Sequence, residues 1–98
     1  MEEYRYQIII QTQPNVNIKC KENSFIGEGK AISSLNNALK TFNFSITQIT
    51  SRASNIGAYK QFRLLTNETP TDLIEIFLNC RDIIDGAYEK GFAEDTGI

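Results

Sequence analysis

The sequence predicts an α+β fold: a two-layer sandwich in which a four-stranded antiparallel sheet carries two helices on one face, in the order ββαββα. Short runs alternate apolar and polar residues at the period of a half-buried strand. Two longer segments repeat apolar residues every three or four positions, as amphipathic helices do. The chain of 98 residues is expected to form one domain, residues 1–98, around a single modest core.

Two strands are expected close to the N-terminus. Apolar or aromatic residues occupy every second position of two short runs, namely Tyr4, Tyr6, Ile8 and Ile10, followed by Val16, Ile18 and Cys20. This alternation is typical of strands with one buried face, and residues 12–15 supply turn chemistry between them. Residues 1–21 are therefore predicted to form a hairpin.

A second hairpin is predicted from two runs rich in β-branched and aromatic residues, 44–51 and 59–66. Residues 52–57 join them and contain Asn55 and Gly57, which tolerate the positive φ of a tight link. A helix is expected on each side of this hairpin. The first follows the glycine-containing turn at residues 27–29, and its apolar stripe consists of Ile32, Leu35, Leu39 and Phe42.

The second helix has the clearest predicted boundaries. Thr69 is a suitable N-cap, Pro70 fits the first helical position, and Asp72 places negative charge in the first turn. Its predicted apolar face consists of Leu73, Ile76, Phe77, Cys80, Ile83 and Ile84. Gly86 is the expected C-cap, and no further strand is predicted after it.

Composition excludes several kinds of active site. The chain has no histidine and only two cysteines, so Ser-His-Asp catalysis lacks its base and an ordinary tetrahedral zinc site lacks its ligands. Acidic pairs such as Asp72 with Glu75 fall on the polar stripe of the second helix, where solvated side chains are the rule. We therefore expect no catalytic residue, no metal and no cofactor, and we expect that the protein is not an enzyme.

Other whole-chain properties predict a cytoplasmic protein with no membrane partner. The net charge is −2, and hydrophobic residues make up 41% of the chain. No apolar run approaches the roughly 20 residues that a membrane-spanning helix needs. The N-terminal residues show neither the basic start nor the apolar segment of a signal peptide.

One segment resembles a known family. Residues 51–59 read Ser-Arg-Ala-Ser-Asn-Ile-Gly-Ala-Tyr, and a strand and a helix beginning near Thr71 follow them. This segment, about a third of the chain, resembles the serine, glycine and tyrosine hairpin and the following helix of YbeD-like members of the ACT-like, ferredoxin-related regulatory domains. The resemblance implies a small regulatory or adaptor module that often self-associates and has no catalytic residues of its own. The order predicted above differs from that family in having two strands before the first helix and none after the second.

A candidate ligand or partner surface is expected on the sheet face opposite the helices. Its outward-phase residues are Arg5, Ile9, Lys19, Lys21, Arg63 and Leu65. Apolar residues among polar ones on a bare sheet face indicate a partner surface. The basic members would also suit the phosphates of a nucleic acid, although a solvated sheet face commonly uses Lys and Arg for solubility.

The leading functional interpretation is a small, non-enzymatic binding or regulatory module that recognises a small anionic ligand or a protein partner. A homodimer is expected, because two strand edges and one sheet face remain uncovered in the predicted fold. Joining through edge strands is favoured over face-to-face packing, which would bring basic residues together. The alternative interpretation is a protein that binds nucleic acid or a nucleotide through the basic sheet face.

Overall fold

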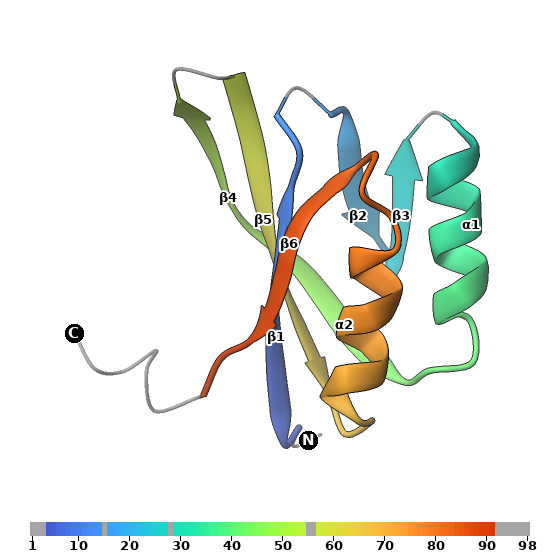
Figure 1. The fold of residues 1–98 in the computed structure, drawn as a ribbon. Helices are drawn as coiled ribbons and strands as arrows, with labels where there is room; N and C mark the ends of the chain where they lie inside the picture. Colours follow the sequence, from blue (N-terminus) through green and yellow to red (C-terminus); the bar gives the residue numbers. More distant parts are fainter. Residues whose placement is uncertain (1–3, 15, 28, 55–56, 92–98) are drawn as a thin grey trace.

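The architecture is α+β, with a four-stranded antiparallel sheet, a separate two-stranded hairpin and two helices (Figure 1). The computed structural model describes residues 4–14, 16–27, 29–54 and 57–91. In chain order the elements are β1 (Tyr6–Thr12), β2 (Ile18–Lys21), β3 (Ser24–Gly27), α1 (Lys30–Leu39), β4 (Phe44–Ser54), β5 (Gly57–Thr66), α2 (Pro70–Leu78) and β6 (Ile84–Glu89).

The large sheet has the strand order β4-β5-β1-β6, and every neighbouring pair is antiparallel. Along the chain, α1 connects toward β4 and α2 connects β5 to β6, which gives this sheet the split βαβ connectivity. The β2–β3 hairpin is inserted between β1 and α1. The predicted α+β class and four-stranded antiparallel sheet are confirmed, whereas the predicted order ββαββα is wrong.

The hairpin predicted within residues 1–21 does not form. Strand β1 instead lies between β5 and β6, with Ile9 opposite Arg63 on one side and Tyr88 on the other. Residues 8–10 are all isoleucine and at most 4% exposed. A strand that is apolar on both phases is best accommodated at the centre of a sheet, where both of its edges are paired. The short strand β2 pairs only with β3, outside the large sheet.

The second predicted hairpin is present as β4 and β5, and both strands extend further than expected. Its predicted link includes Asn55 and Ile56, which lie outside the described residues. The register between the two strands shifts between Gln48 and Thr50, so β4 carries a β-bulge at this point.

The small β2–β3 hairpin is held against the large sheet by polar contacts. Its two-residue link consists of Glu22 and Asn23, with φ values of 52° and 63°, as a tight hairpin turn with two left-handed residues requires. The Asn23 Oδ1 accepts a hydrogen bond of 3.1 Å from the Ile46 N–H on β4. Lys60 on β5 donates from Nζ to the Ile18 carbonyl on β2 over 2.7 Å. The hairpin therefore contacts the edge of β4 and also reaches the middle of the sheet.

The two helices begin where the sequence predicts. On α1 the buried residues are Ile32, Leu35 and Leu39, as the apolar stripe indicates, while Phe42 lies beyond the helix end and is half-buried. Thr69 is the N-cap of α2, but its side chain makes no capping hydrogen bond. Pro70 occupies the first helical position, as expected.

The predicted end of α2 is wrong. The helix stops at Leu78, and Gly86, expected as its C-cap, lies within β6. The Cys80 carbonyl accepts hydrogen bonds from the N–H groups of Ile83 and Ile84, and this turn leads directly into the strand. The apolar spacing through Ile83 and Ile84 fits a helix and a buried turn equally well, so periodicity alone did not distinguish them.

The core lies between the large sheet, the small hairpin and the helices, which are both on the same side of the sheet (Figure 1). At its centre Phe25 of β3 contacts Phe62 of β5 edge-on, with ring centroids 5.4 Å apart. It contacts Phe77 of α2 in the same manner at 5.9 Å. Edge-to-face aromatic pairs are favourable beyond the area that they bury. Phe25 therefore links the hairpin, the sheet and the second helix.

Replacing the core residues of α2 should destabilise the fold strongly. Leu73 and Phe77 are fully buried, so Leu73→Ala and Phe77→Ala are each expected to lower the free energy of unfolding by about 2–5 kcal/mol. Glu75→Ala, on the exposed side of the same helix, is the matched control and should change it by less than about 0.5 kcal/mol. Urea denaturation measures all three. A loss below about 1 kcal/mol for both core variants would contradict the packing described here.

Candidate functional site

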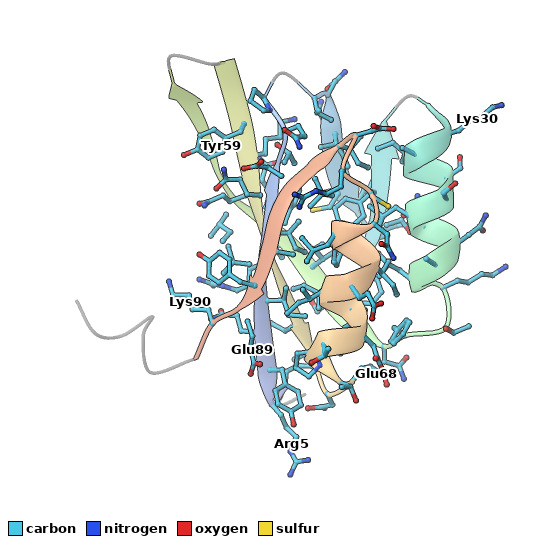
Figure 2. The ribbon with its side chains drawn as sticks, viewed as in Figure 1. Arg5, Lys30, Tyr59, Glu68, Glu89 and Lys90 are labelled. Carbon is cyan, nitrogen blue, oxygen red and sulfur yellow. The ribbon has the colours of Figure 1, made fainter. Side chains whose placement is uncertain are left out.

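The face of the large sheet turned away from the helices, hereafter the outer face, is not covered by another element of the described chain (Figure 1). Figure 2 shows Tyr59 and Lys90 projecting from this face, on the side of the sheet away from α1 and α2. Because side chains alternate along a strand, the outer-phase residues of β1, β5 and β6 form rows that run across the sheet.

The middle row contains both apolar and basic groups. Ile9 of β1 is flanked by Arg63 of β5 and Tyr88 of β6. Although Ile9 faces outward in phase, it is only 4% exposed, whereas Tyr88 is 52% exposed. Leu65 lies in the neighbouring row, opposite Gln7, and is half-buried. In these two rows the accessible apolar groups are Tyr88 and part of Leu65, and the expectation that Ile9 would be an open contact residue is wrong.

Side-chain amides brace the strands on this face. Gln61 of β5 donates to Gln11 Oε1 of β1 at 3.4 Å, and Gln11 in turn donates to the Asp85 carboxylate of β6 at 3.2 Å. Gln7 is 1% exposed and donates from Nε2 to the Lys90 carbonyl at 3.4 Å. These bonds join three strands through their side chains, in addition to the backbone ladder. The side-chain amides of Gln7, Gln11 and Gln61 on the outer face are thus paired within the protein.

The predicted basic residues do not all share this surface. Arg63 lies on the outer face, and Arg5 is exposed just before β1, where its backbone N–H donates to Asn67 Oδ1 at 2.8 Å. Lys19 and Lys21 are on β2, which belongs to the separate hairpin and not to the large sheet. The structure therefore places Arg63, Ile9 and Leu65 together and leaves two of the predicted lysines elsewhere.

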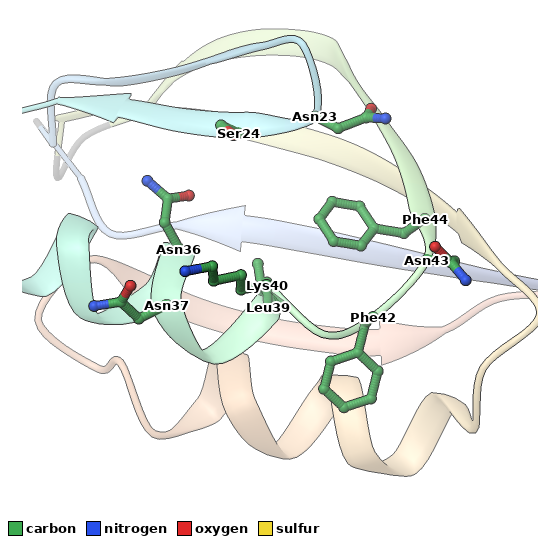
Figure 3. Close-up of a pocket in the computed structure, with 9 residues that line it drawn as sticks. All are labelled: Asn23, Ser24, Asn36, Asn37, Leu39, Lys40, Phe42, Asn43 and Phe44. Atoms are coloured by element: carbon green, nitrogen blue, oxygen red, sulfur yellow. The ribbon is translucent and has the colours of Figure 1, made fainter.

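A pocket of about 480 Å³ lies on a different part of the molecule, between the β2–β3 hairpin, the end of α1 and the start of β4 (Figure 3). Such a volume is within the range of small-molecule sites. Its lining consists of Asn23, Ser24, Asn36, Asn37, Leu39, Lys40, Phe42, Asn43 and Phe44. Our sequence interpretation missed this site. The clustering of asparagines around residues 36–43 was its only signal.

Two of the pocket amides already have structural partners. Asn36 accepts a hydrogen bond from the Phe25 N–H at 3.0 Å and donates to the Phe25 carbonyl at 2.8 Å, which fixes α1 to β3. The side-chain oxygen Oδ1 of Asn23 accepts a hydrogen bond from the Ile46 N–H. The remaining polar side chains of the lining are exposed, and Lys40 is its one charged residue. A lining without a carboxylate or a thiol offers polar contacts to a small molecule but no acid-base pair.

The described residues hold no evident reactive centre. No group of three or more cysteine, aspartate or glutamate residues in the described ranges is arranged to hold a metal ion. Burial, and secondarily the nearby Asp82 carboxylate, raises the pKa of the Cys80 thiol. A thiol with a raised pKa is protonated at neutral pH and is a poor nucleophile. Neither helix in the described part of the chain is long and apolar enough to cross a membrane.

Truncating Ile9 should destabilise the protein as a core substitution would. Because Ile9 is nearly inaccessible, Ile9→Ala is expected to lower the free energy of unfolding by about 2–4 kcal/mol. Ile49 is 41% exposed on β4, and Ile49→Ala, the matched control, should cost less than about 1 kcal/mol. Chemical denaturation compares the two variants, and equal losses would show that Ile9 is not covered by its neighbours.

The paired amide of Asn36 should be distinguishable from its neighbour on the same helix. Asn36→Ala leaves the Phe25 backbone groups without a partner, whereas Asn37 is exposed. Both variants gain the same helix propensity. Asn36→Ala is therefore expected to be about 1–3 kcal/mol less stable than Asn37→Ala in thermal or urea unfolding. Equal stabilities would argue against the α1–β3 contact.

The chain matches no family model, and it matches no curated protein and no solved structure. Its function is therefore inferred from the residues and contacts described above.

Proposed function

We propose that this protein is a small, non-catalytic binding or regulatory module that self-associates and recognises a protein partner through the outer face of its large sheet. The observation that carries the proposal is the uncovered outer face, where Tyr88 is 52% exposed in the same row as the half-buried Arg63, and the half-buried Leu65 lies in the neighbouring row. Aromatic residues and arginine are the side chains most enriched at protein interfaces. Bracing by Gln7, Gln11 and Gln61 supports this role, since an ordered surface loses little conformational freedom on binding.

A protein partner is favoured over a small ligand. The pocket near α1 is open to solvent along residues that are mostly exposed, and Asn23 and Asn36 in its lining are already occupied by backbone groups. Small-molecule sites usually enclose most of their ligand and present unoccupied polar groups to it. The outer face, by contrast, extends across four strands.

The resemblance to YbeD-like members of the ACT-like domains agrees with this role, because it implies a self-associating regulatory or adaptor module. The order predicted from sequence lacked a strand after the second helix, and β6 supplies one. A nucleic-acid role has less support, since Lys19 and Lys21 lie on the separate hairpin and only part of the predicted basic group remains on the outer face.

Native mass spectrometry of the full chain purified from its own host tests the proposal. We expect a species that contains a second protein chain, either another copy or a different protein, without a small molecule retained. Leu65→Lys should reduce the fraction bound by at least tenfold, because it places a charge in the outer face. The matched control Ile26→Lys alters an exposed residue of the small hairpin and should leave binding unchanged.

Two results would contradict the proposed function. One is a single unassociated chain at all concentrations. The other is robust turnover in an activity screen that one side-chain substitution abolishes, since this would identify an enzyme.

A further inference from the structure

The two edges of the large sheet differ in how far they are open to a further strand. On β4, the Ile46 N–H already donates to Asn23 Oδ1, and the bulge between Gln48 and Thr50 interrupts the regular edge just beyond it. Bulges and covering segments are two of the means by which natural proteins prevent strand addition at an edge. The edge strand β6 also has a bulge, at Asp85, but from Gly86 to Glu89 it pairs regularly with β1, and no described segment covers this part of its edge.

The open groups of β6 can be identified from its pairing with β1. The Lys90 N–H donates to the Gln7 carbonyl at 2.8 Å. Residues of an antiparallel strand alternate in the direction of their backbone groups. The backbone N–H and carbonyl of Tyr88 therefore also point toward β1, while those of Ala87 and Glu89 point away from it. No group of the described chain pairs with the outward backbone groups of these two residues.

One further outward group of β6 is already occupied. Asp85 is the extra residue of the β6 bulge and has no partner on β1, and its carbonyl accepts a hydrogen bond of 3.4 Å from Arg81 Nη1. The open part of the edge is thus limited to residues 87–89.

We propose that β6 pairs antiparallel with β6 of a second copy of this chain, in the register that places Tyr88 opposite Tyr88. This inference deepens the self-association that forms part of the proposed function. The pairing would join two large sheets into one continuous sheet of eight strands.

The hydrogen-bonding groups and charges along the β6 edge favour this register over the other two-fold symmetric registers. A two-fold antiparallel pair must place one residue opposite itself. With Tyr88 at the axis, Ala87 of each copy exchanges hydrogen bonds with Glu89 of the other, so every open backbone group is used. With Ala87 at the axis, Asp85 would oppose Glu89 twice, and like charges opposite each other are unfavourable. That register would also need the Asp85 carbonyl as a hydrogen-bond acceptor for the second copy, but this carbonyl already accepts a hydrogen bond from Arg81.

The neighbouring registers fail for similar reasons. With the axis at Glu89, the Glu89 carboxylates of the two copies would lie opposite each other, which is unfavourable. An axis at Gly86 pairs Ala87 with Asp85, whose carbonyl is again occupied, and it leaves the open groups of Glu89 unused. Only the Tyr88 axis satisfies both the hydrogen-bonding and the charge requirements.

The side chains of the outer face also suit the Tyr88 axis. Tyr88 would occupy a non-hydrogen-bonded site, where opposite Cα atoms are about 4.5 Å apart and side chains approach most closely. Cross-strand aromatic pairs at such sites are favourable. Beside it, Gly86 would oppose Lys90 of the second copy, and the space into which a side chain at Gly86 would project is empty. The exposed Tyr88 rings would therefore cover each other without a clash at Gly86.

Sedimentation equilibrium of the full chain at micromolar concentration tests the pairing. We expect a dimer whose dissociation constant rises at least tenfold in Tyr88→Lys, because two ammonium groups would meet at the axis. Ile26→Lys is the matched control, since Ile26 is 50% exposed and lies on the small hairpin, and its dissociation constant should be unchanged. Circular dichroism establishes that each variant is folded before it is compared.

Disulfide formation tests the register independently of affinity. Tyr88→Cys should form a covalent dimer under mild oxidation, because the Cα separation at this site lies within the range that disulfides span. Ala87→Cys, which retains the same native Cys20 and Cys80, is the control and should not form a dimer through residue 87.

The possible failures are distinguishable. A dimer that Tyr88→Lys does not weaken, or one in which Tyr88→Cys forms no disulfide, would overturn the β6 pairing but leave the outer face as a partner surface. A protein that is monomeric throughout would overturn the pairing together with the self-association in the proposed function. Loss of partner binding in Leu65→Lys can be scored separately from either result.

Discussion

Strand β1 has to be covered on both faces and paired on both edges, because three consecutive isoleucines point alternately to opposite sides of the sheet. Pairing with β5 and β6 satisfies its edges. The core under the helices covers Ile8 and Ile10, and long outer-face neighbours cover Ile9. The strands on either side of β1, and the helix that leads into β6, are therefore arranged around one apolar segment near the N-terminus.

The small hairpin completes the cover of the core where two short helices do not suffice. Its Phe25 packs against the sheet and α2, while Asn36 of α1 pairs with the Phe25 backbone. Asn23 and Lys60 add polar contacts to two different strands of the sheet. Because apolar packing and hydrogen bonds converge on this insertion, we expect it to unfold together with the rest of the domain.

Local pattern predicted the elements whose partners are near in sequence. The β4–β5 hairpin and the buried face of α1 follow from alternation and helical spacing alone. The partner of β1 could not be predicted, because alternation shows that a strand has a buried face but not which distant strand pairs with it. Ile84 and Gly86 were misassigned, since the same apolar spacing fits one more helical turn. At the candidate surface, the outward phase of Ile9 was inferred correctly, but its cover depends on Tyr88, whose strand was not predicted.

The Asn23 contact with β4 limits the ways in which these molecules can stack. Growth of an open-ended filament requires each molecule to offer two free and complementary strand edges. Here a side chain from an inserted turn occupies a backbone donor of one edge strand, and a bulge distorts the same edge nearby. With β6 paired as proposed above, a mutation of the hairpin turn that frees the β4 edge would favour fibrous aggregation over a closed dimer, even where the stability of the isolated domain is little changed.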